Sequence, residues 1–176
     1  IVQRCAAEGW PAKVAAVVSN RADAKGLEFA AARGIATAVV DHKAFASRDA
    51  FDDALAQSID AFAPDLVVLA GFMRILGARF VQHYAERLLN VHPSLLPAFP
   101  GLHTHQRALD AGCKAVGATV HSVTSTLDLG QIVFLHRRLP HCDDDGHSPR
   151  VNREGLLKFS HRLLDEAAEG FKKVQR

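Results

Sequence analysis

Asn90 and His92 occupy alternate positions at the end of an apolar run, where both side chains could serve one reaction. The segment 88–91 predicts a strand, and the three prolines within 93–100 forbid regular structure after it. Residues two apart on a strand face the same side, and ligands of open α/β sheets bind outside the carboxyl ends of the strands. A neutral amide and an imidazolium placed there could stabilise a developing oxyanion. On these residues alone, an Asn that caps a turn and a His packed against it explain the pattern equally well.

Asp128 lies in the turn Leu127-Asp128-Leu129-Gly130 and is the candidate carboxylate for this site. An opposite charge within about 4 to 6 Å of an imidazole favours the charged ring. The sequence alone does not establish that positions 92 and 128 meet. An Asp that satisfies its own turn backbone is the simpler interpretation of the residue taken by itself.

Other polar clusters predict no metal site. His103, His105 and His121 could join His92 around a metal, but their spacing fits no common zinc signature, so we expect them to support the site instead. The stretch 141–147 mixes hard and soft ligands and is expected to be a solvated acidic loop. The sequence has neither a Walker-type nor a G-x-G-x-x-G phosphate loop.

The elements that must position these residues alternate between strands and helices. Strands are predicted over 14–18, 35–40, 66–70, 88–91, 117–123 and 132–139. Helices are predicted up to Glu8, over 24–33, from Ser47 to before Pro64, and over 75–84, 105–111 and 153–174. Such alternation with short connections predicts an α/β fold with a doubly wound, Rossmann-like, mostly parallel sheet. The last two strands are expected to form an antiparallel pair at one edge.

Length and composition narrow the class of protein. The chain has 176 residues, a formal charge of +2 and three cysteines. The length predicts a single domain, 1–176, with a sizeable core. The small, dispersed charge argues against a nucleic-acid partner, and the odd number of cysteines argues for a reducing compartment, with the cytoplasm as the default. No apolar run of about eighteen residues occurs, so neither a membrane span nor a signal peptide is expected.

Several motifs together resemble one enzyme family. HPSLLP and PGLHTHQRAL resemble the folate-dependent formyltransferases, and most closely those that act on glycinamide ribonucleotide in purine synthesis. SLLP is common to the whole group, whereas GLHTHQRAL is more specific. The resemblance continues through SNRADAKGLEFAAARGI, APDLVVLAGFMRIL and GATVHSVTSTLDLG, covers roughly residues 1–133 and weakens beyond them. It implies transfer of a formyl group from 10-formyltetrahydrofolate to an amine by direct attack, without a metal or a covalent intermediate.

The resemblance also assigns roles to individual residues. It implies that Asn90, His92 and Asp128 are the catalytic amide, imidazole and carboxylate. It implies that the folate donor is bound by Arg48, Met73, Arg74, Ile75, Leu76, Asn90, Thr124, Ser125, Thr126, Leu127 and Asp128. Within this set, Arg48 would meet the glutamate tail of the folate and 73–76 the pterin. Without the family, a solvated helix residue and an apolar strand-to-helix junction explain these positions as well.

Parts of the family pattern have no match in this sequence. In the family a first strand and a Gly-rich loop, which binds the acceptor phosphate, precede the opening helix, and neither is present before Ile1. The family usually carries two small residues after the carboxylate, and here the first is Leu129. The tail 139–176 diverges, so the residues that hold the acceptor are not assigned. Two alternatives therefore stay open: a 10-formyltetrahydrofolate hydrolase, and a non-catalytic folate-binding or degenerate copy. The oligomeric state, monomer or homodimer, is not determined either.

Overall fold

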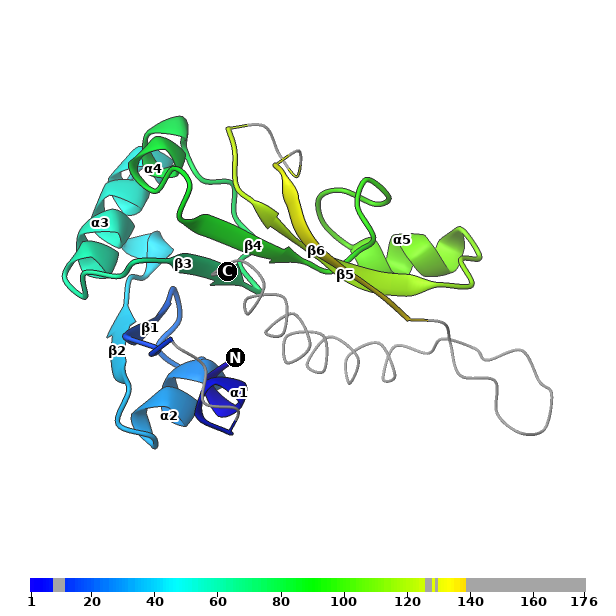
Figure 1. The fold of residues 1–176 in the computed structure, drawn as a ribbon. Coiled ribbons are helices and arrows are strands. Elements are labelled where there is room, and N and C mark those ends of the chain that lie inside the picture. The colour runs from blue at the N-terminus through cyan, green and yellow to red at the C-terminus, as the bar shows by residue number, and fades with distance from the viewer. Residues whose placement is uncertain (8–11, 126–127, 129, 139–176) are drawn as a thin grey trace. The chain divides into compact units, whose positions relative to one another are not determined.

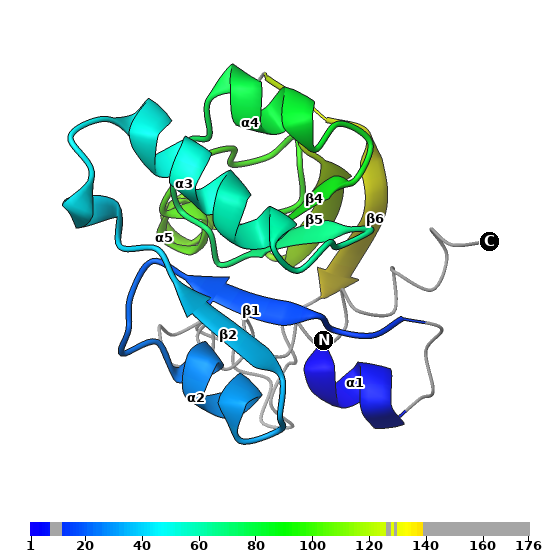
Figure 2. The same cartoon turned by 90° about the vertical axis from the view of Figure 1, so that its left-hand side faces the viewer.

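The computed structural model describes residues 1–7, 12–125, 128 and 130–138. The chain contains two compact units (Figures 1 and 2). The N-terminal unit comprises 2–67 and 74–87, and the C-terminal unit comprises Ile1, 68–73 and the described residues from Leu88 onward. The helix predicted over 153–174 and the acidic loop at 141–147 lie outside the described residues.

The N-terminal unit begins with a helix and a strand–helix–strand arrangement. Helix α1 (Val2–Ala7) precedes strand β1 (Ala16–Ser19), helix α2 (Lys25–Ala31) and strand β2 (Ala36–Val39). The two strands pair in parallel, with Ala16 opposite Ala36. Helix α2 connects them and packs against both, burying Leu27 and Ala30 (Figure 2). This is the βαβ unit that the alternating pattern predicts.

Two further helices complete the N-terminal unit, after a single turn of 3-10 helix, η1 (His42–Ala44). Helix α3 (Arg48–Asp60) begins where the Ser47 hydroxyl accepts a hydrogen bond from the Ala50 N–H, which is a standard N-cap. Its buried positions include Phe51 and Leu55, one turn apart and therefore on one face. Helix α4 (Ala78–His83) packs against α3.

The C-terminal unit is built around one sheet with strand order β3-β4-β5-β6. The strands are β3 (Val67–Ala70), β4 (Leu88–His92), β5 (Val116–Ser122) and β6 (Ile132–Arg138), and helix α5 (Thr104–Asp110) lies between β4 and β5 in the chain. Figure 1 shows the arrows of β3 and β4 pointing the same way, whereas β5 runs antiparallel to both β4 and β6.

The predicted mixed α/β, Rossmann-like fold is confirmed, with parallel strands in both units and antiparallel strands at the end of the second sheet. The antiparallel part begins one strand earlier than predicted, because β5 pairs with β4 as well as with β6. The register between β4 and β5 sets which side chains meet, so this difference determines the geometry of the site.

Buried apolar residues hold β4 in the centre of the C-terminal unit. Leu88, Leu89 and Val91 are buried on β4, and Ala118 and Val120 are buried on β5. Burial on both faces accounts for the successive apolar residues Leu88 and Leu89 on this strand. Within the described residues, no helix has the length and apolar character needed to cross a bilayer.

Candidate active site

Strands β4 and β5 bring four polar side chains to one face of the C-terminal sheet. Asn90 and His92 are two residues apart on β4, so they face the same side. The register places Asn90 opposite His121 and His92 opposite Thr119. Residues that lie directly opposite each other on neighbouring strands share a face, so the pairing adds both β5 residues to this group.

Both ring nitrogens of His92 face oxygen atoms. Nε2 lies 3.1 Å from the carbonyl oxygen of Phe99, and Nδ1 lies 3.5 Å from Oδ2 of Asp128. A carbonyl oxygen only accepts, so Nε2 carries a proton and donates to Phe99. A second proton on Nδ1 makes the contact with the Asp128 carboxylate attractive. The residue is only 5% exposed, so both contacts are shielded from solvent.

Asp128 is a buried carboxylate shared by three nitrogen atoms. Its side chain is 5% exposed. The Gly101 N–H donates to Oδ2 over 2.8 Å, and Oδ1 lies 3.5 Å from Nε2 of His121. The residue adopts a positive φ of 52°, as short polar side chains tolerate in turns. The structure thus brings together positions 92 and 128, whose proximity the sequence could not establish.

A hydrogen-bonded chain orients the amide of Asn90. Nδ1 of His121 donates to the carbonyl oxygen of Ser122 over 2.9 Å, which leaves Nε2 of the neutral ring as an acceptor. The Asn90 Nδ2 group lies 3.2 Å from this atom and donates to it. An amide NH₂ group has two hydrogens, so one N–H of Asn90 stays available to another acceptor. His121 therefore orients the Asn90 amide directly, while its supporting role in catalysis stays a prediction.

Residues that the sequence did not single out fix the loop after β4. The Thr119 hydroxyl donates to the Ser94 carbonyl over 2.7 Å and accepts from the Leu96 N–H over 3.0 Å. The Thr104 hydroxyl donates to the Pro93 carbonyl over 2.8 Å. Ser94, Thr104 and Thr119 are all buried. The run HPSLLP marked this loop in the sequence. It did not reveal that Thr119, on the neighbouring strand, bonds to the loop.

The other two histidines of the predicted supporting group differ in their surroundings. His103 is exposed and adopts a positive φ of 56° at the N-cap of α5. His105, half-buried on α5, has its pKa lowered first by burial and then by the charge of His92. Among the residues that the structure describes, no group of His, Cys, Asp and Glu side chains could hold a metal ion.

The predicted donor-binding residues are divided between the two units. Met73, Thr124 and Ser125 belong to the C-terminal unit and are exposed, Met73 by 60%. Asn90 and Asp128 also belong to the C-terminal unit, and the N-terminal unit contains the remaining described members, Arg48, Arg74, Ile75 and Leu76. Thr126 and Leu127, like Leu129, lie outside the described residues. Donor binding by this set stays a prediction.

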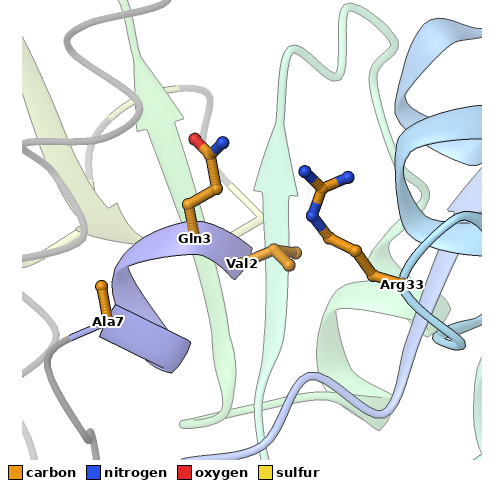
Figure 3. A pocket seen from close by; sticks show the side chains of 4 residues that line it. All are labelled: Val2, Gln3, Ala7 and Arg33. Carbon is orange, nitrogen blue, oxygen red and sulfur yellow. The ribbon is translucent and has the colours of Figure 1, made fainter.

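A shallow hollow of about 470 Å³ lies in the N-terminal unit (Figure 3). Figure 3 shows Val2, Gln3 and Ala7 of α1 and Arg33, which follows α2. The Arg33 guanidinium stacks on the Phe29 ring, 3.5 Å from its centroid. None of these lining residues belongs to the predicted site, so the hollow adds no group to the chemistry of Asn90, His92 and Asp128.

A half-buried amide and a buried imidazole near the end of a strand, with a buried carboxylate beside the imidazole, are the groups that an acyl-transferring enzyme needs. The sequence matches the model of the formyl transferase family over residues 1–149, and the chain belongs to this family.

Individual relatives agree with this assignment. The chain is 53% identical over 140 residues to the phosphoribosylglycinamide formyltransferase of Escherichia coli, covering 80% of this chain and 66% of that protein. It is 43% identical over 162 residues to the trifunctional purine biosynthetic protein adenosine-3 of Drosophila melanogaster, covering 91% of this chain and 12% of that protein. The chain thus spans slightly less than two thirds of the bacterial relative and a small part of the trifunctional one.

Solved structures show the same similarity. The phosphoribosylglycinamide formyltransferase of Brucella melitensis superposes with a TM-score of 0.80 at 46% identity, covering 97% of this chain and 86% of that one. Glycinamide ribonucleotide transformylase 1 of Symbiobacterium toebii superposes with a TM-score of 0.82 at 40% identity, covering 98% of this chain and 80% of that one.

Proposed function

We propose that this protein transfers the formyl group of 10-formyltetrahydrofolate to the amine of glycinamide ribonucleotide, a step of purine synthesis. The observation that carries the proposal is the buried contact between His92 and Asp128, with Asn90 two residues before the histidine on the same strand. The relatives named phosphoribosylglycinamide formyltransferase support this choice of donor and acceptor.

In the proposed reaction the amine nitrogen attacks the formyl carbon, and negative charge develops on the formyl oxygen. The free N–H of Asn90 and a ring N–H of His92 donate to this oxygen. His92 already donates from Nε2 to an oxygen, the Phe99 carbonyl, and would exchange this partner for the formyl oxygen. Removing one donor of this kind typically lowers the rate by about 10² to 10³. The amine nitrogen loses a proton, and the departing folate nitrogen gains one.

Asp128 keeps His92 charged and oriented during this step. The carboxylate is held by the Gly101 N–H, so its position does not depend on His92 alone. Because the side chain is almost entirely buried, water screens the attraction between the two groups only weakly. His121 accepts from Asn90 through Nε2 and so holds the amide in position on the same face as His92.

For the donor, we propose that residues 73–76 bind the pterin, that Arg48 meets the glutamate tail, and that residues 124–128 also bind the donor. The exposed apolar side chains of Met73 and Ile75 support this assignment, because they offer apolar surface for a ring. A guanidinium pairs well with a carboxylate, which suits Arg48 to the tail.

We further propose a single catalytic domain that works in the cytoplasm as a monomer or homodimer on small-molecule substrates, without nucleic acid or membrane. The odd number of cysteines, three at unrelated spacings, supports a reducing compartment.

Separate assays of formyl transfer and formate release test the proposal. The purified protein would be incubated with 10-formyltetrahydrofolate in the presence and absence of glycinamide ribonucleotide. The proposal expects formylated ribonucleotide and little formate. Formate release that does not depend on the ribonucleotide would assign the protein to the hydrolases. Donor binding without either product would indicate a non-catalytic folate-binding protein.

A further inference from the structure

Asp52 is a buried carboxylate that the proposed mechanism does not use. It lies on α3, is 5% exposed, and its Oδ2 accepts a hydrogen bond from the Gly77 N–H over 2.7 Å. Gly77 is buried as well and is the N-cap residue of α4. The bond therefore connects the second turn of α3 to the residue at which α4 begins. All of these residues belong to the N-terminal unit.

The two positive charges near Asp52 belong to predicted donor-binding residues, and Asp49 adds a negative charge. Arg48 lies one turn earlier on α3, and both Arg48 and Arg74 interact electrostatically with the carboxylate. The Arg74 guanidinium also lies over the ring of Phe51, 5.2 Å from its centroid. One acidic side chain thus holds the backbone of residue 77 and attracts the guanidinium groups of Arg48 and Arg74.

The contact with Gly77 leaves little room for a side chain. A Cβ atom at this position would lie 3.1 Å from Oδ2 of Asp52 and 3.6 Å from Oδ1 of Asp49. The first of these distances is tighter than ordinary packing, so a larger residue at 77 would push the carboxylate away. The position of the Asp52 carboxylate therefore depends on a glycine at residue 77.

We propose that Asp52 is a positioning residue for the folate donor, which it serves by holding the segment 74–77 and Arg48 in one arrangement. The inference rests on the proposed function, because it takes Arg48, Arg74, Ile75 and Leu76 as donor-binding residues. Asp52 itself is too buried to contact a ligand, and it acts through the Gly77 N–H and the two arginines. Burying a carboxylate is costly unless it is bonded, which makes an apolar residue the simpler choice if packing were the sole requirement.

A neighbouring pair offers a matched control. Asp53 and Arg79 also connect α3 to α4, with Oδ1 of the aspartate 3.6 Å from a guanidinium nitrogen, but this pair is largely exposed. Removing Asp53 takes away a carboxylate at the adjacent position without touching Gly77. A general effect of weakening the contact between α3 and α4 would be common to both substitutions.

The test measures the dissociation constant of tetrahydrofolate and the KM of glycinamide ribonucleotide for the full chain and its variants. Asp52→Ala leaves a buried N–H without an acceptor and should weaken tetrahydrofolate binding by about 10-fold or more, with the KM of the ribonucleotide within about 2-fold of wild type. Asp52→Asn can still accept from Gly77 through its amide oxygen and should bind within about 3-fold of wild type. Asp53→Ala should bind as wild type does.

A second variant covers the case in which Asp52→Ala does not fold. Gly77→Ala disturbs the same contact from the other side and should weaken tetrahydrofolate binding, whereas Gly26→Ala, at a position with open space, should not. Wild-type tetrahydrofolate binding in Asp52→Ala or Gly77→Ala overturns the inference, and so does an Asp52→Asn variant as weak as Asp52→Ala. If the wild-type chain itself binds no tetrahydrofolate, the proposed function fails before the variants are compared.

Discussion

At the scale of single residues, Asp128 combines two roles that the sequence presented as alternatives. Its backbone makes a turn with a positive φ of 52°, which is the simpler interpretation of an Asp in this context. Its side chain is nevertheless buried beside His92 and His121. An Asp whose only role is to form a turn would have a solvent-exposed carboxylate. Burial between two imidazoles and the Gly101 N–H is the evidence that this carboxylate has a further role.

Asp128→Asn should lower turnover in formyl transfer by about 10² to 10⁴, because an amide keeps the shape of the side chain but does not stabilise a charged His92. The dissociation constant of tetrahydrofolate should change by less than about 3-fold, since the substitution removes stabilisation of the transition state and leaves the donor-binding segment at 73–76 intact. Steady-state kinetics and equilibrium binding check the two expectations.

Asp110→Asn serves as the control for this substitution. Asp110 ends helix α5, is exposed and accepts a hydrogen bond from the side chain of Gln106. The same chemical change there should leave turnover within about 2-fold of wild type, as expected for a surface substitution. Turnover in Asp128→Asn that matches this control removes Asp128 from the mechanism.

At the scale of elements, the hairpin of β5 and β6 depends on Gly130. A Cβ atom at this residue would lie 1.6 Å from the carbonyl oxygen of Ser122, which is impossible without moving the backbone. The same carbonyl accepts the hydrogen bond from Nδ1 of His121. Of the two small residues that the family carries after its carboxylate, this chain retains the second, and the close approach to Ser122 explains why that position requires glycine.

Gly130→Ala should therefore lower both stability and turnover. Backbone displacement at Ser122 shifts His121 and, through it, Asn90. We expect a loss of about 2 kcal/mol or more in the free energy of unfolding, as overpacking typically causes, and at least about a 10-fold loss of turnover. Urea unfolding and steady-state kinetics measure the two effects. Wild-type values for both would show that the backbone accommodates the methyl group.

Gly26→Ala should have the opposite effect on stability. Gly26 is exposed within helix α2, has open space around its Cα and has no positive φ. Replacing glycine by alanine at a position whose backbone conformation alanine adopts without strain typically stabilises by about 0.4 to 1 kcal/mol, because the unfolded chain loses freedom. Urea unfolding of the variant should show this gain with unchanged turnover, and a destabilised variant would contradict the assignment of Gly26 to an unstrained helical position.

Element boundaries show where periodicity suffices and where long-range contacts decide. The strand predicted over 66–70 is observed as Val67–Ala70, because an apolar run between a Pro and a Gly leaves few alternatives. The helix predicted from Ile75 begins only at Ala78. Asp52, distant in the sequence, accepts from the Gly77 N–H and sets this start. Strand β4 extends to His92 because that residue pairs with Thr119 on β5.

At the scale of the whole molecule, local sequence patterns predicted the α/β class. They could not predict that Asp128 lies beside His92, because the two residues are far apart in the sequence. Nothing in the spacing of Asn90 and Asp128 encodes the register that sets Asn90 opposite His121. Two successive antiparallel pairings, β4 with β5 and β5 with β6, are needed to return the turn at Asp128 to His92. The family resemblance supplied this proximity, and the residue types supplied only the chemistry.

The pH dependence of the free energy of unfolding is also a property of the whole molecule, because every titratable group contributes to it. Burial, and after it the charge of His92, lowers the pKa of His105 in the folded protein. In the unfolded chain a histidine titrates near pH 6.5, so the unfolded state binds this proton first as pH falls. The contribution of His105 is therefore fully present above about pH 6.5 and is lost as pH falls towards the folded pKa. Asp52, whose pKa is raised chiefly by burial, acts in the opposite sense, since its protonation favours the folded state.

His105→Gln should make the free energy of unfolding less sensitive to acid. The difference between wild type and variant isolates the His105 contribution, because Asp52 is common to both proteins. Urea unfolding at intervals between pH 8 and pH 5 should give curves that converge as the pH falls, with the wild type losing more stability than the variant. His103→Gln, the same change on an exposed side chain two residues away, is the matched control. Parallel curves for wild type and His105→Gln would mean that His105 is solvated as freely in the folded protein as in the unfolded chain, and its burial on α5 would then have to be abandoned.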